Sequence, residues 1–458
     1  MGSFYVENFG CRATQADGAA IERQLTDRGL SRAGSASEAE IVVLNTCTVT
    51  SSADQDARAA IRRIHRNNPS ARILVTGCYA QRAPEEIAAI EGVSLVVGNS
   101  HKHRLAEIAS GNGFVPLGSV VNASLSGASQ ASAAQRAPIV VEDIFAHTEL
   151  LAAPVFDSDN EKTRPNLKVQ DGCNNRCSFC VIPFVRGRSR SLPLGEVLHN
   201  VDQLVANGYK ELVLSGINLG RWGRDLGRDV SDSIGRARFV DLLRAILERT
   251  SVPLLRISSV EPMDWSDELI ALAASSPRIA KHAHVPLQSG SDRILRLMHR
   301  RYRPWHYEDR IQRIHAAMPT AAIGADVMVG FPGESEEDFE QTRAFIERLP
   351  FTYLHVFTYS SRPGTPSANM QEQVPVQKAR ERNRVLRELA AGKKNCFQQQ
   401  FVGSTLRALT LTQISQGRTE ALTDNYQKLW LQGSLPPNQM LTARIHSIEG
   451  EALVGEVR

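Results

Sequence analysis

Three cysteines lie close together in the stretch Asp171-Gly-Cys-Asn-Asn-Arg-Cys-Ser-Phe-Cys180. Cys173, Cys177 and Cys180 have the spacing C-x3-C-x2-C, which lets one loop wrap its thiols around a single small inorganic centre. Thiolates hold iron–sulfur clusters, and this spacing suits one face of a cubane cluster. No fourth cysteine or histidine lies nearby, so one iron would stay open for another ligand. The alternatives are a redox dithiol and a zinc site, although zinc usually takes four protein ligands in a closed site.

A second set of cysteines, Cys11, Cys47 and Cys78, is spread over the first part of the chain. Each follows a short apolar run, and the alternation of such runs with helical stretches predicts a parallel sheet covered on both faces. Sites in open α/β sheets lie beyond the carboxyl ends of the strands, so these thiols should meet at one edge. The alternative is that each cysteine is a small buried apolar side chain. The predicted strands are 3–9, 41–45, 73–76 and 95–97, and the predicted helices include 16–28 and 53–66.

The middle of the chain repeats the strand–helix pattern. Six strand-like runs alternate with helical runs, which predicts a partial barrel of six βα units rather than a closed barrel of eight. Polar motifs follow several of the runs, and the loops at the carboxyl ends of barrel strands are where such a fold carries its chemistry. Ser335-Glu-Glu-Asp338 is a helix-entry signal. The predicted strands are 167–169, 211–214, 254–258, 282–287, 323–329 and 353–359, and the predicted helices include 194–207, 239–249, 267–274, 305–317 and 335–348.

The last part of the chain begins with a basic helical stretch at 376–400 and continues as five short alternating segments. Five short strands predict a small antiparallel β-barrel of the kind that binds RNA. Its five cationic residues are balanced by five acidic ones, so RNA would be held by one face. Further back in the chain, the segment at 118–138 is rich in Ser, Ala, Gly and Gln, and this composition predicts a flexible connection after the first domain. The predicted strands are 405–412, 418–423, 428–431, 440–448 and 452–457, and the predicted domains are 1–117, a linker at 118–138, 139–400 and 401–458.

Composition is that of a soluble globular protein. The chain has 458 residues, 42% of them hydrophobic and 22% charged, and its length suggests about three domains. It shows neither a long uninterrupted apolar run nor a signal-peptide pattern at its start, so we expect a cytoplasmic protein outside the membrane. Cytoplasmic cysteines rarely form disulfides, and Cys396 has no partner thiol. Net charge is only +4, but arginines and lysines gather at 58–72, 186–190, 293–313 and 378–387. Such groups either follow a phosphate backbone or form solvated helix faces.

The cysteine loop resembles that of the radical S-adenosylmethionine (SAM) superfamily. Together with four further motifs it resembles the methylthiotransferase family, and the resemblance runs over nearly the whole chain. The motifs, in order, are Asn45-Thr-Cys-Thr-Val-Thr50, Gly77-Cys-Tyr-Ala-Gln81, Gln170-Asp-Gly-Cys-Asn-Asn-Arg-Cys-Ser-Phe-Cys180, Pro286-Leu-Gln-Ser-Gly-Ser291 and Val329-Gly-Phe-Pro-Gly-Glu334.

The resemblance implies two [4Fe–4S] clusters and SAM as cofactors. One SAM would donate a methyl group to sulfur at the auxiliary cluster, and a second would be cleaved to a 5′-deoxyadenosyl radical that removes a hydrogen from the substrate. The implied ligands are Cys173, Cys177 and Cys180 for the catalytic radical SAM cluster, and Cys11, Cys47 and Cys78 for the auxiliary cluster. The implied SAM contacts are Ser215 and Gly216 at its amino end, and Ser259, Glu261 and Gln288 at its ribose or carboxylate. The terminal barrel would match the family's TRAM module.

The family acts on two modified adenosines of tRNA and on an aspartate of a ribosomal protein. The first two motifs and Thr423-Asp-Asn-Tyr-Gln-Lys428 most resemble the branch that methylthiolates C2 of N6-threonylcarbamoyladenosine 37. The expected partners are the tRNA anticodon loop and an electron donor such as flavodoxin or ferredoxin, and nothing in the sequence identifies the sulfur donor. The alternatives are methylthiolation of N6-isopentenyladenosine 37 and a nonenzymatic iron–sulfur protein that binds RNA or acts as a sensor.

Overall fold

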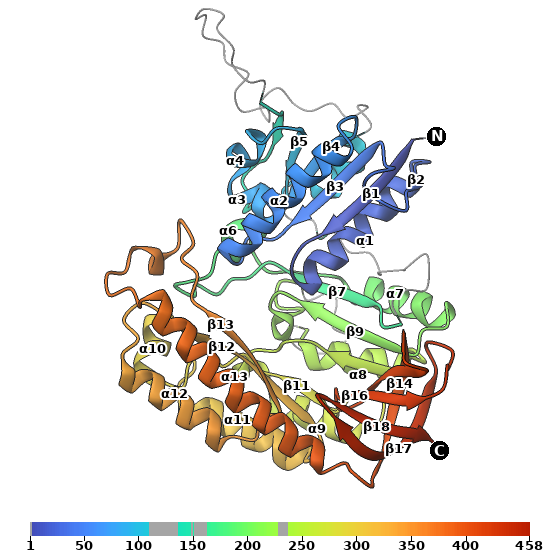
Figure 1. The fold of residues 1–458 in the computed structure, drawn as a ribbon, viewed down its shortest axis with the longest axis vertical. Coiled ribbons are helices and arrows are strands. Elements are labelled where there is room, and N and C mark those ends of the chain that lie inside the picture. Colours follow the sequence, from blue (N-terminus) through green and yellow to red (C-terminus); the bar gives the residue numbers. More distant parts are fainter. Residues whose placement is uncertain (1, 110–135, 148–149, 151–162, 228–236) are drawn as a thin grey trace, which may run out of the picture.

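The computed structural model describes residues 2–109, 136–147, 150, 163–227 and 237–458. Figure 1 shows an amino-terminal α/β part above a central α/β part, with a small β-barrel against the lower right of the centre. Most of the predicted linker at 118–138 and part of the approach to the cysteine loop lie outside the described residues. None of the described helices is long and apolar enough to cross a membrane.

The amino-terminal part contains a parallel sheet of six described strands in the order β2-β1-β3-β4-β5-β6. The four predicted strands are confirmed, and β3 is buried at every position, as expected for the centre of a parallel sheet. The two-residue strands at the edges are too short to leave a periodic signal in the sequence. The strands are β1 (Ser3–Asn8), β2 (Ser31–Arg32), β3 (Ile41–Thr46), β4 (Arg72–Gly77), β5 (Val93–Gly98) and β6 (Ile139–Val140).

Helices cover both faces of this sheet, as predicted. One apolar core joins the sheet to α2, α3 and α4, and a second joins its other face to α1 and α5. Helix α1 begins directly after Cys11, earlier than predicted. The start was missed because its N-cap residue, Cys11, makes no side-chain hydrogen bond to the helix and is not a recognisable start signal. The helices are α1 (Arg12–Thr26), α2 (Ser51–Asn67), α3 (Cys78–Arg82), α4 (Pro84–Ala88) and α5 (Leu105–Ala109).

The central part is an open arc of six parallel strands, as predicted. Strands β7, β9 and β10 pair in one sheet and β11, β12 and β13 in another, and single bridges such as Ser259 to His284 connect β10 with β11. A short antiparallel strand, β8, is added beside β7. The strands are β7 (Asn166–Asp171), β8 (Arg190–Ser191), β9 (Glu211–Gly216), β10 (Leu254–Ile257), β11 (His282–His284), β12 (Ala322–Val329) and β13 (Tyr353–Thr358).

The helices of the central part pack against the arc and form one continuous apolar core with it. Helix α12 begins with the predicted signal, since Ser335 and Asp338 form a reciprocal capping box. The short helices α6 and α10 were not predicted. The helices are α6 (Ile182–Arg186), α7 (Leu194–Ala206), α8 (Phe239–Arg249), α9 (Asp267–Ser275), α10 (Asp292–Leu297), α11 (Pro304–Ala317) and α12 (Glu336–Arg348).

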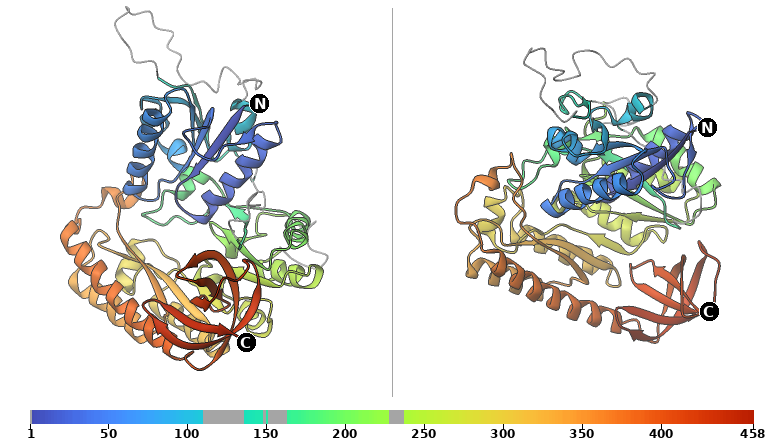
Figure 2. Two further views of the ribbon diagram at one scale, coloured as in Figure 1. Left: turned by 45° about the vertical axis from the view of Figure 1, so that its right-hand side comes forward. Right: turned by 45° about the horizontal axis from the view of Figure 1, so that its top comes forward.

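The predicted basic helix, α13 (Val376–Gln399), runs along the central part and leads into the terminal barrel (Figure 2). Five strands close the barrel in the order β14-β15-β16-β18-β17. Its seams are antiparallel as predicted except β16–β18, because a closed ring with an odd number of strands cannot alternate direction throughout. The strands are β14 (Thr405–Ser415), β15 (Arg418–Thr423), β16 (Lys428–Gln432), β17 (Met440–Glu449) and β18 (Ala452–Val457).

Buried polar contacts join the barrel to the centre. Arg256 of β10 is inaccessible to solvent and donates to Glu211 of β9 at 2.6 Å. The same guanidinium donates to the backbone carbonyl oxygens of Thr423 and Asp424, each at 3.1 Å. The ring of Tyr426 packs 4.5 Å from the ring of His282. The barrel is therefore attached to the central part near the first residues of β9 and β11.

Candidate functional site

Cys11, Cys47 and Cys78, here called the strand-end trio, lie at one edge of the amino-terminal sheet. Asn8 pairs with Asn45, and Thr46 with Gly77, so β1, β3 and β4 end in register. Cys47 and Cys78 directly follow the paired Thr46 and Gly77. The predicted convergence of the three cysteines is therefore seen in the fold.

Two glycines allow the backbone to pass closely around the strand-end trio. Gly10 has φ of +99°, and a Cβ placed there would lie 2.8 Å from the sulfur of Cys47. Gly77 has φ of +101°, and its Cβ would lie 2.3 Å from the carbonyl oxygen of Thr46. Only glycine adopts these conformations without strain and leaves this space free.

The thiols of the strand-end trio influence one another. Burial, followed by the neighbouring Cys78 and Cys11, raises the pKa of the Cys47 thiol to about 12. Within the described part of the chain, no set of His, Cys, Asp or Glu side chains has the arrangement for a single metal ion. A cubane cluster needs a wider spacing, since each cysteine binds a different iron. Three cysteines that meet at one sheet edge are a donor set that suits a [4Fe–4S] cluster, in which each thiolate binds a different iron.

Cys173, Cys177 and Cys180, here called the loop trio, lie on the loop that follows β7. They line a cavity of about 830 Å³. Gly172 starts the loop with φ of +70°, and a Cβ there would lie 2.0 Å from the carbonyl oxygen of Arg188. Burial, followed by Cys177, raises the pKa of Cys180 to about 12. The loop thus forms a partly enclosed pocket with three thiols on its wall.

Polar groups from neighbouring elements contact the loop trio. Asn218, just beyond β9, donates its side-chain amide to the sulfur of Cys173 at 3.6 Å. Arg300 donates to the sulfur of Cys177 at 3.2 Å and also to the carboxylate of Glu261. Hydrogen-bond donors to cluster sulfurs favour the more negative, reduced state of a cluster. Asn218 and Arg300 are therefore functional candidates to which the sequence assigned no role at the loop trio.

The predicted SAM contacts Ser215, Gly216 and Glu261 lie near the loop trio. Ser215 is buried, and its hydroxyl has no hydrogen-bond partner among the described residues. A Cβ on Gly216 would lie 2.9 Å from the side-chain oxygen of Gln170, which accepts from the backbone N–H of Asn218. Glu261 reaches the loop through Arg300. The free Ser215 hydroxyl comes three residues before Asn218, which contacts Cys173, and a buried free hydroxyl suits a polar ligand.

Ser259 and Gln288 are placed differently. Ser259 hydrogen-bonds His284, whose other ring nitrogen lies 3.3 Å from Asp326. Gln288 has φ of +66° and lines a second cavity, together with Asp326 and Cys180. The structure therefore brings Gln288 to the wall of this second cavity, and Ser259 is linked to the cavity through His284 and Asp326.

The second cavity lies between the two trios. It has a volume of about 260 Å³ and is mainly apolar. Val49 and Thr50, which follow Cys47, form one side, and Cys180 and residues of the central strands form the other. A molecule held there would touch segments adjoining both trios. This cavity is the best candidate for the place where a substrate meets both sites.

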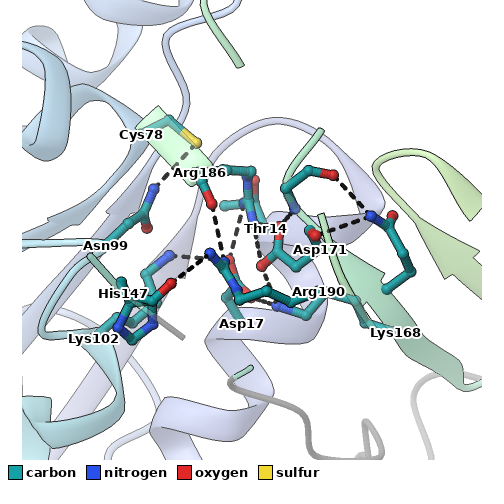
Figure 3. A network of polar contacts seen from close by, with 12 residues as sticks. Thr14, Asp17, Cys78, Asn99, Lys102, His147, Lys168, Asp171, Arg186 and Arg190 are labelled. Carbon is teal, nitrogen blue, oxygen red and sulfur yellow. Dashed lines mark hydrogen bonds and ion pairs between the residues drawn. The ribbon is translucent and has the colours of Figure 1, made fainter. Parts of the chain in front are cut away.

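Many of the grouped cations in the sequence form ion pairs within the fold. Arg186 and Arg300 are buried, and neither can follow a phosphate backbone. The interpretation of 186–190 and 293–313 as nucleic-acid contacts is thus wrong for these two arginines. Arg186 forms ion pairs with Asp17 and Asp171 and interacts electrostatically with Cys78 (Figure 3). Further members of these groups that form ion pairs are Arg58, Arg63, Arg293, Arg296, Arg303, Arg310, Arg313, Lys378, Arg382 and Arg384.

Two family models match the chain. Residues 3–98 match the uncharacterized protein family UPF0004, and residues 167–346 match the radical SAM superfamily. The first match contains the strand-end trio and the second contains the loop trio. Each trio therefore falls in a separately defined family region.

Curated relatives match nearly the full length. The chain is 37% identical to the threonylcarbamoyladenosine tRNA methylthiotransferase MtaB of Aquifex aeolicus, over 92% of this chain and 94% of that protein. It is 36% identical to the Bacillus subtilis protein of the same name, over 95% and 91%. It is also 32% identical to the tRNA-2-methylthio-N(6)-dimethylallyladenosine synthase of Syntrophobacter fumaroxidans, over 98% and 95%.

A solved structure has the same fold. The radical SAM methyltransferase TsrM of Kitasatospora setae, determined with cobalamin and a [4Fe–4S] cluster bound, aligns with a TM-score of 0.57 at 17% identity. The alignment covers 80% of this chain and 76% of TsrM. The central strands and the cysteine loop therefore form a radical SAM fold. With the full-length relatives, this shows that the chain belongs to the radical SAM methylthiotransferase family.

Proposed function

We propose that this protein adds a methylthio group to C2 of N6-threonylcarbamoyladenosine 37 in tRNA, using two molecules of SAM. The observation that carries the proposal is the similarity, over nearly the whole chain, to relatives named for that nucleoside. The presence of two cysteine trios on either side of one cavity supports it, because methylthiolation needs both a radical source and a sulfur site. The cytoplasm is the expected compartment for this tRNA modification.

In this proposal each trio holds one [4Fe–4S] cluster, with the loop trio as the catalytic radical SAM site and the strand-end trio as the auxiliary site. When bound, the clusters and SAM supply hydrogen abstraction, sulfur and the methyl group. Ser215 and Gly216 would receive the amino end of SAM, and their closeness in the chain to Asn218, which contacts Cys173, supports this assignment. Glu261 and Gln288 are proposed for its other polar groups, and Ser259 would act through His284.

The substrate base would enter the cavity of about 260 Å³ between the trios. An anticodon-loop base is unpaired and can be splayed out of its stack at low cost. Thr50 and Asp326 offer polar contacts on the cavity wall, and Val49 and Met328 offer apolar ones. The terminal barrel, proposed to be a TRAM module, would contact the tRNA body, and a donor such as flavodoxin or ferredoxin would supply electrons.

Nucleoside analysis of cellular tRNA tests this proposal directly. Cells lacking the protein should lose the 2-methylthio form of threonylcarbamoyladenosine and regain it when the gene is restored. The Cys173→Ala variant should not restore it. Loss of the 2-methylthio isopentenyl nucleoside instead would replace the proposed substrate by the alternative, which 32% identity to the dimethylallyladenosine enzyme also supports.

The nonenzymatic alternative makes a different prediction in vitro. Reconstituted and reduced protein should convert SAM to 5′-deoxyadenosine if it is the proposed enzyme. A sensor has no need of the free Ser215 hydroxyl or of a cavity shared by both trios. Protein that carries its clusters but leaves SAM intact would favour the sensor.

A further inference from the structure

Five charged side chains are buried together where the amino-terminal part meets the centre (Figure 3). Asp17 and Lys102 come from the amino-terminal part, and Lys168, Asp171 and Arg186 come from the central part. Their exposed fractions lie between 1% and 6%. Burying charge is costly unless the groups are paired, and here each of the two carboxylates forms ion pairs with at least two cations.

The contacts of the network are close and well directed. Arg186 donates to Asp17 at 2.9 Å and to both carboxylate oxygens of Asp171 at 3.0 Å. Lys102 donates to Asp17 at 2.9 Å, and Lys168 donates to Asp171 at 2.9 Å and also to Asp17. Burial alone would raise the pKa of the Asp17 carboxyl, but the three cations hold it below its ordinary value. Both carboxylates are therefore ionised.

When all five groups are ionised, three cations face two carboxylates, which leaves one positive charge in surplus. Arg186 keeps its charge at any physiological pH, because a guanidinium is not deprotonated in proteins. An uncompensated positive charge in a buried place favours a negative group nearby. The strand-end trio is such a group once its thiols bind iron as thiolates.

Helix α6 brings this charge to the strand-end trio. The helix follows Cys180 of the loop trio by two residues and ends at Arg186. Its Val185 packs against Cys78 in a small apolar cluster. Asn99 donates to the sulfur of Cys78 at 3.6 Å and to the carbonyl oxygen of Val185 at 2.7 Å. A single short element thus connects one trio to the other.

We propose that Arg186 is a positioning residue for the cluster of the strand-end trio. Held by Asp17 and Asp171, it places a permanent positive charge beside the three thiolates and so raises the reduction potential of that cluster. Through α6 it also fixes the strand-end trio relative to the loop trio. The inference rests on the proposed function, which supplies the second cluster.

The direction of the expected shift in reduction potential follows from electrostatics. Reduction adds one negative charge to a cluster, and a nearby cation stabilises the reduced form more than the oxidised form. Removal of the Arg186 charge should therefore lower the potential. Removal of the Asp17 charge, which offsets part of the cation, should raise it. Opposite shifts from two contacting residues distinguish an electrostatic effect from simple loosening of the structure.

The experiment uses the full chain with the loop trio replaced by alanine, so that only the strand-end cluster gives a signal. Redox titration followed by electron paramagnetic resonance should show a lower potential for Arg186→Met and a higher one for Asp17→Asn. Arg186→Lys retains the charge and should fall between Arg186→Met and the unsubstituted residue. Shifts of the same sign in Arg186→Met and Asp17→Asn, or no shift with iron content retained, would overturn the proposal.

A matched control comes from the other trio. Arg300 is also buried and ion-paired, but it donates to Cys177 of the loop trio. In the background above, Arg300→Met should leave the potential unchanged, and a shift equal to that of Arg186→Met would count against the assignment. If Arg186→Met does not fold, the signs for Arg186→Lys and Asp17→Asn decide. Absence of iron from the background protein would refute the second cluster itself, and with it the proposed function, whereas a cluster insensitive to Arg186 refutes only this inference.

Discussion

The loop trio lies on one loop after β7, whereas the strand-end trio comes from three different strand ends. The loop alone sets the order and spacing of its thiols. The strand-end thiols meet only because β1, β3 and β4 pair in register. A site made by one segment tolerates change elsewhere, whereas a site assembled from three strands depends on everything that holds the sheet in place.

The electrostatic support of the two trios differs in the same way. Each has one amide donor at 3.6 Å from a sulfur, Asn218 for the loop trio and Asn99 for the strand-end trio. Each also has one buried arginine. Arg300 contacts a sulfur directly, whereas Arg186 acts from within a network that spans two parts of the molecule. The strand-end trio is thus supported by charged contacts between the amino-terminal and central parts.

The largest expected effect separates the two trios by loss of a ligand. Cys173→Ala should abolish SAM cleavage, because the radical SAM cluster loses one of its three ligands. Cys47→Ala should spare some cleavage but abolish methylthiolation. Chromatography of 5′-deoxyadenosine and of the tRNA nucleosides measures both. Equal loss of cleavage in the two folded variants would contradict the division of labour.

Glycine substitutions should break each trio through the backbone. Gly10→Ala should prevent cluster binding at the strand-end trio, and Gly172→Ala should prevent it at the loop trio. Each substitution forces a strained φ and a steric clash, so each should lower the free energy of unfolding by about 2 kcal/mol or more. Gly29 also has a positive φ but open space around it. Gly29→Ala should cost only about 1 kcal/mol and leave both clusters. Iron analysis and urea unfolding compare the iron content and stability of these variants. Equal iron content and stability in Gly10→Ala and Gly29→Ala would contradict the prediction.

Amide substitutions should have smaller, site-specific effects. Asn218→Ala should lower the reduction potential of the loop-trio cluster only, and Asn99→Ala that of the strand-end cluster only, because each removes one donor to a sulfur. Stability should change by about 1 kcal/mol, as for other single hydrogen bonds. Redox titration of each cluster in a background lacking the other measures the shift. Crossed effects would show that the two sites are not electrostatically separate.

The smallest expected effect sets the baseline. Ser335→Ala removes the cap of α12 and should cost about 1 kcal/mol of stability. It should leave both cluster potentials unchanged, because α12 contributes no group to either trio. Urea unfolding and the same redox titrations measure this. A change in potential here would mean that general loosening, rather than local charge, controls the clusters.

Local signals predicted much of this molecule. The strands followed from apolar runs, the start of α12 from Ser335 and Asp338, and the strand-end trio from the position of each cysteine after a strand. The role of Arg186 could not be predicted, because its partner Asp17 lies 169 positions away and the sequence does not reveal burial. Arg186 and Arg300 belong to basic groups that, without the fold, resemble a nucleic-acid surface.

The contact of Arg256 with the terminal barrel makes the central part sensitive to removal of the barrel. Arg256 fills part of its hydrogen-bonding capacity with carbonyl groups of β15 and the turn after it. A chain cut before residue 401 would therefore expose a guanidinium and Glu211 that are now sealed from water. The last fifty-eight residues therefore cover a buried ion pair of the central part, and their removal would expose this pair to water.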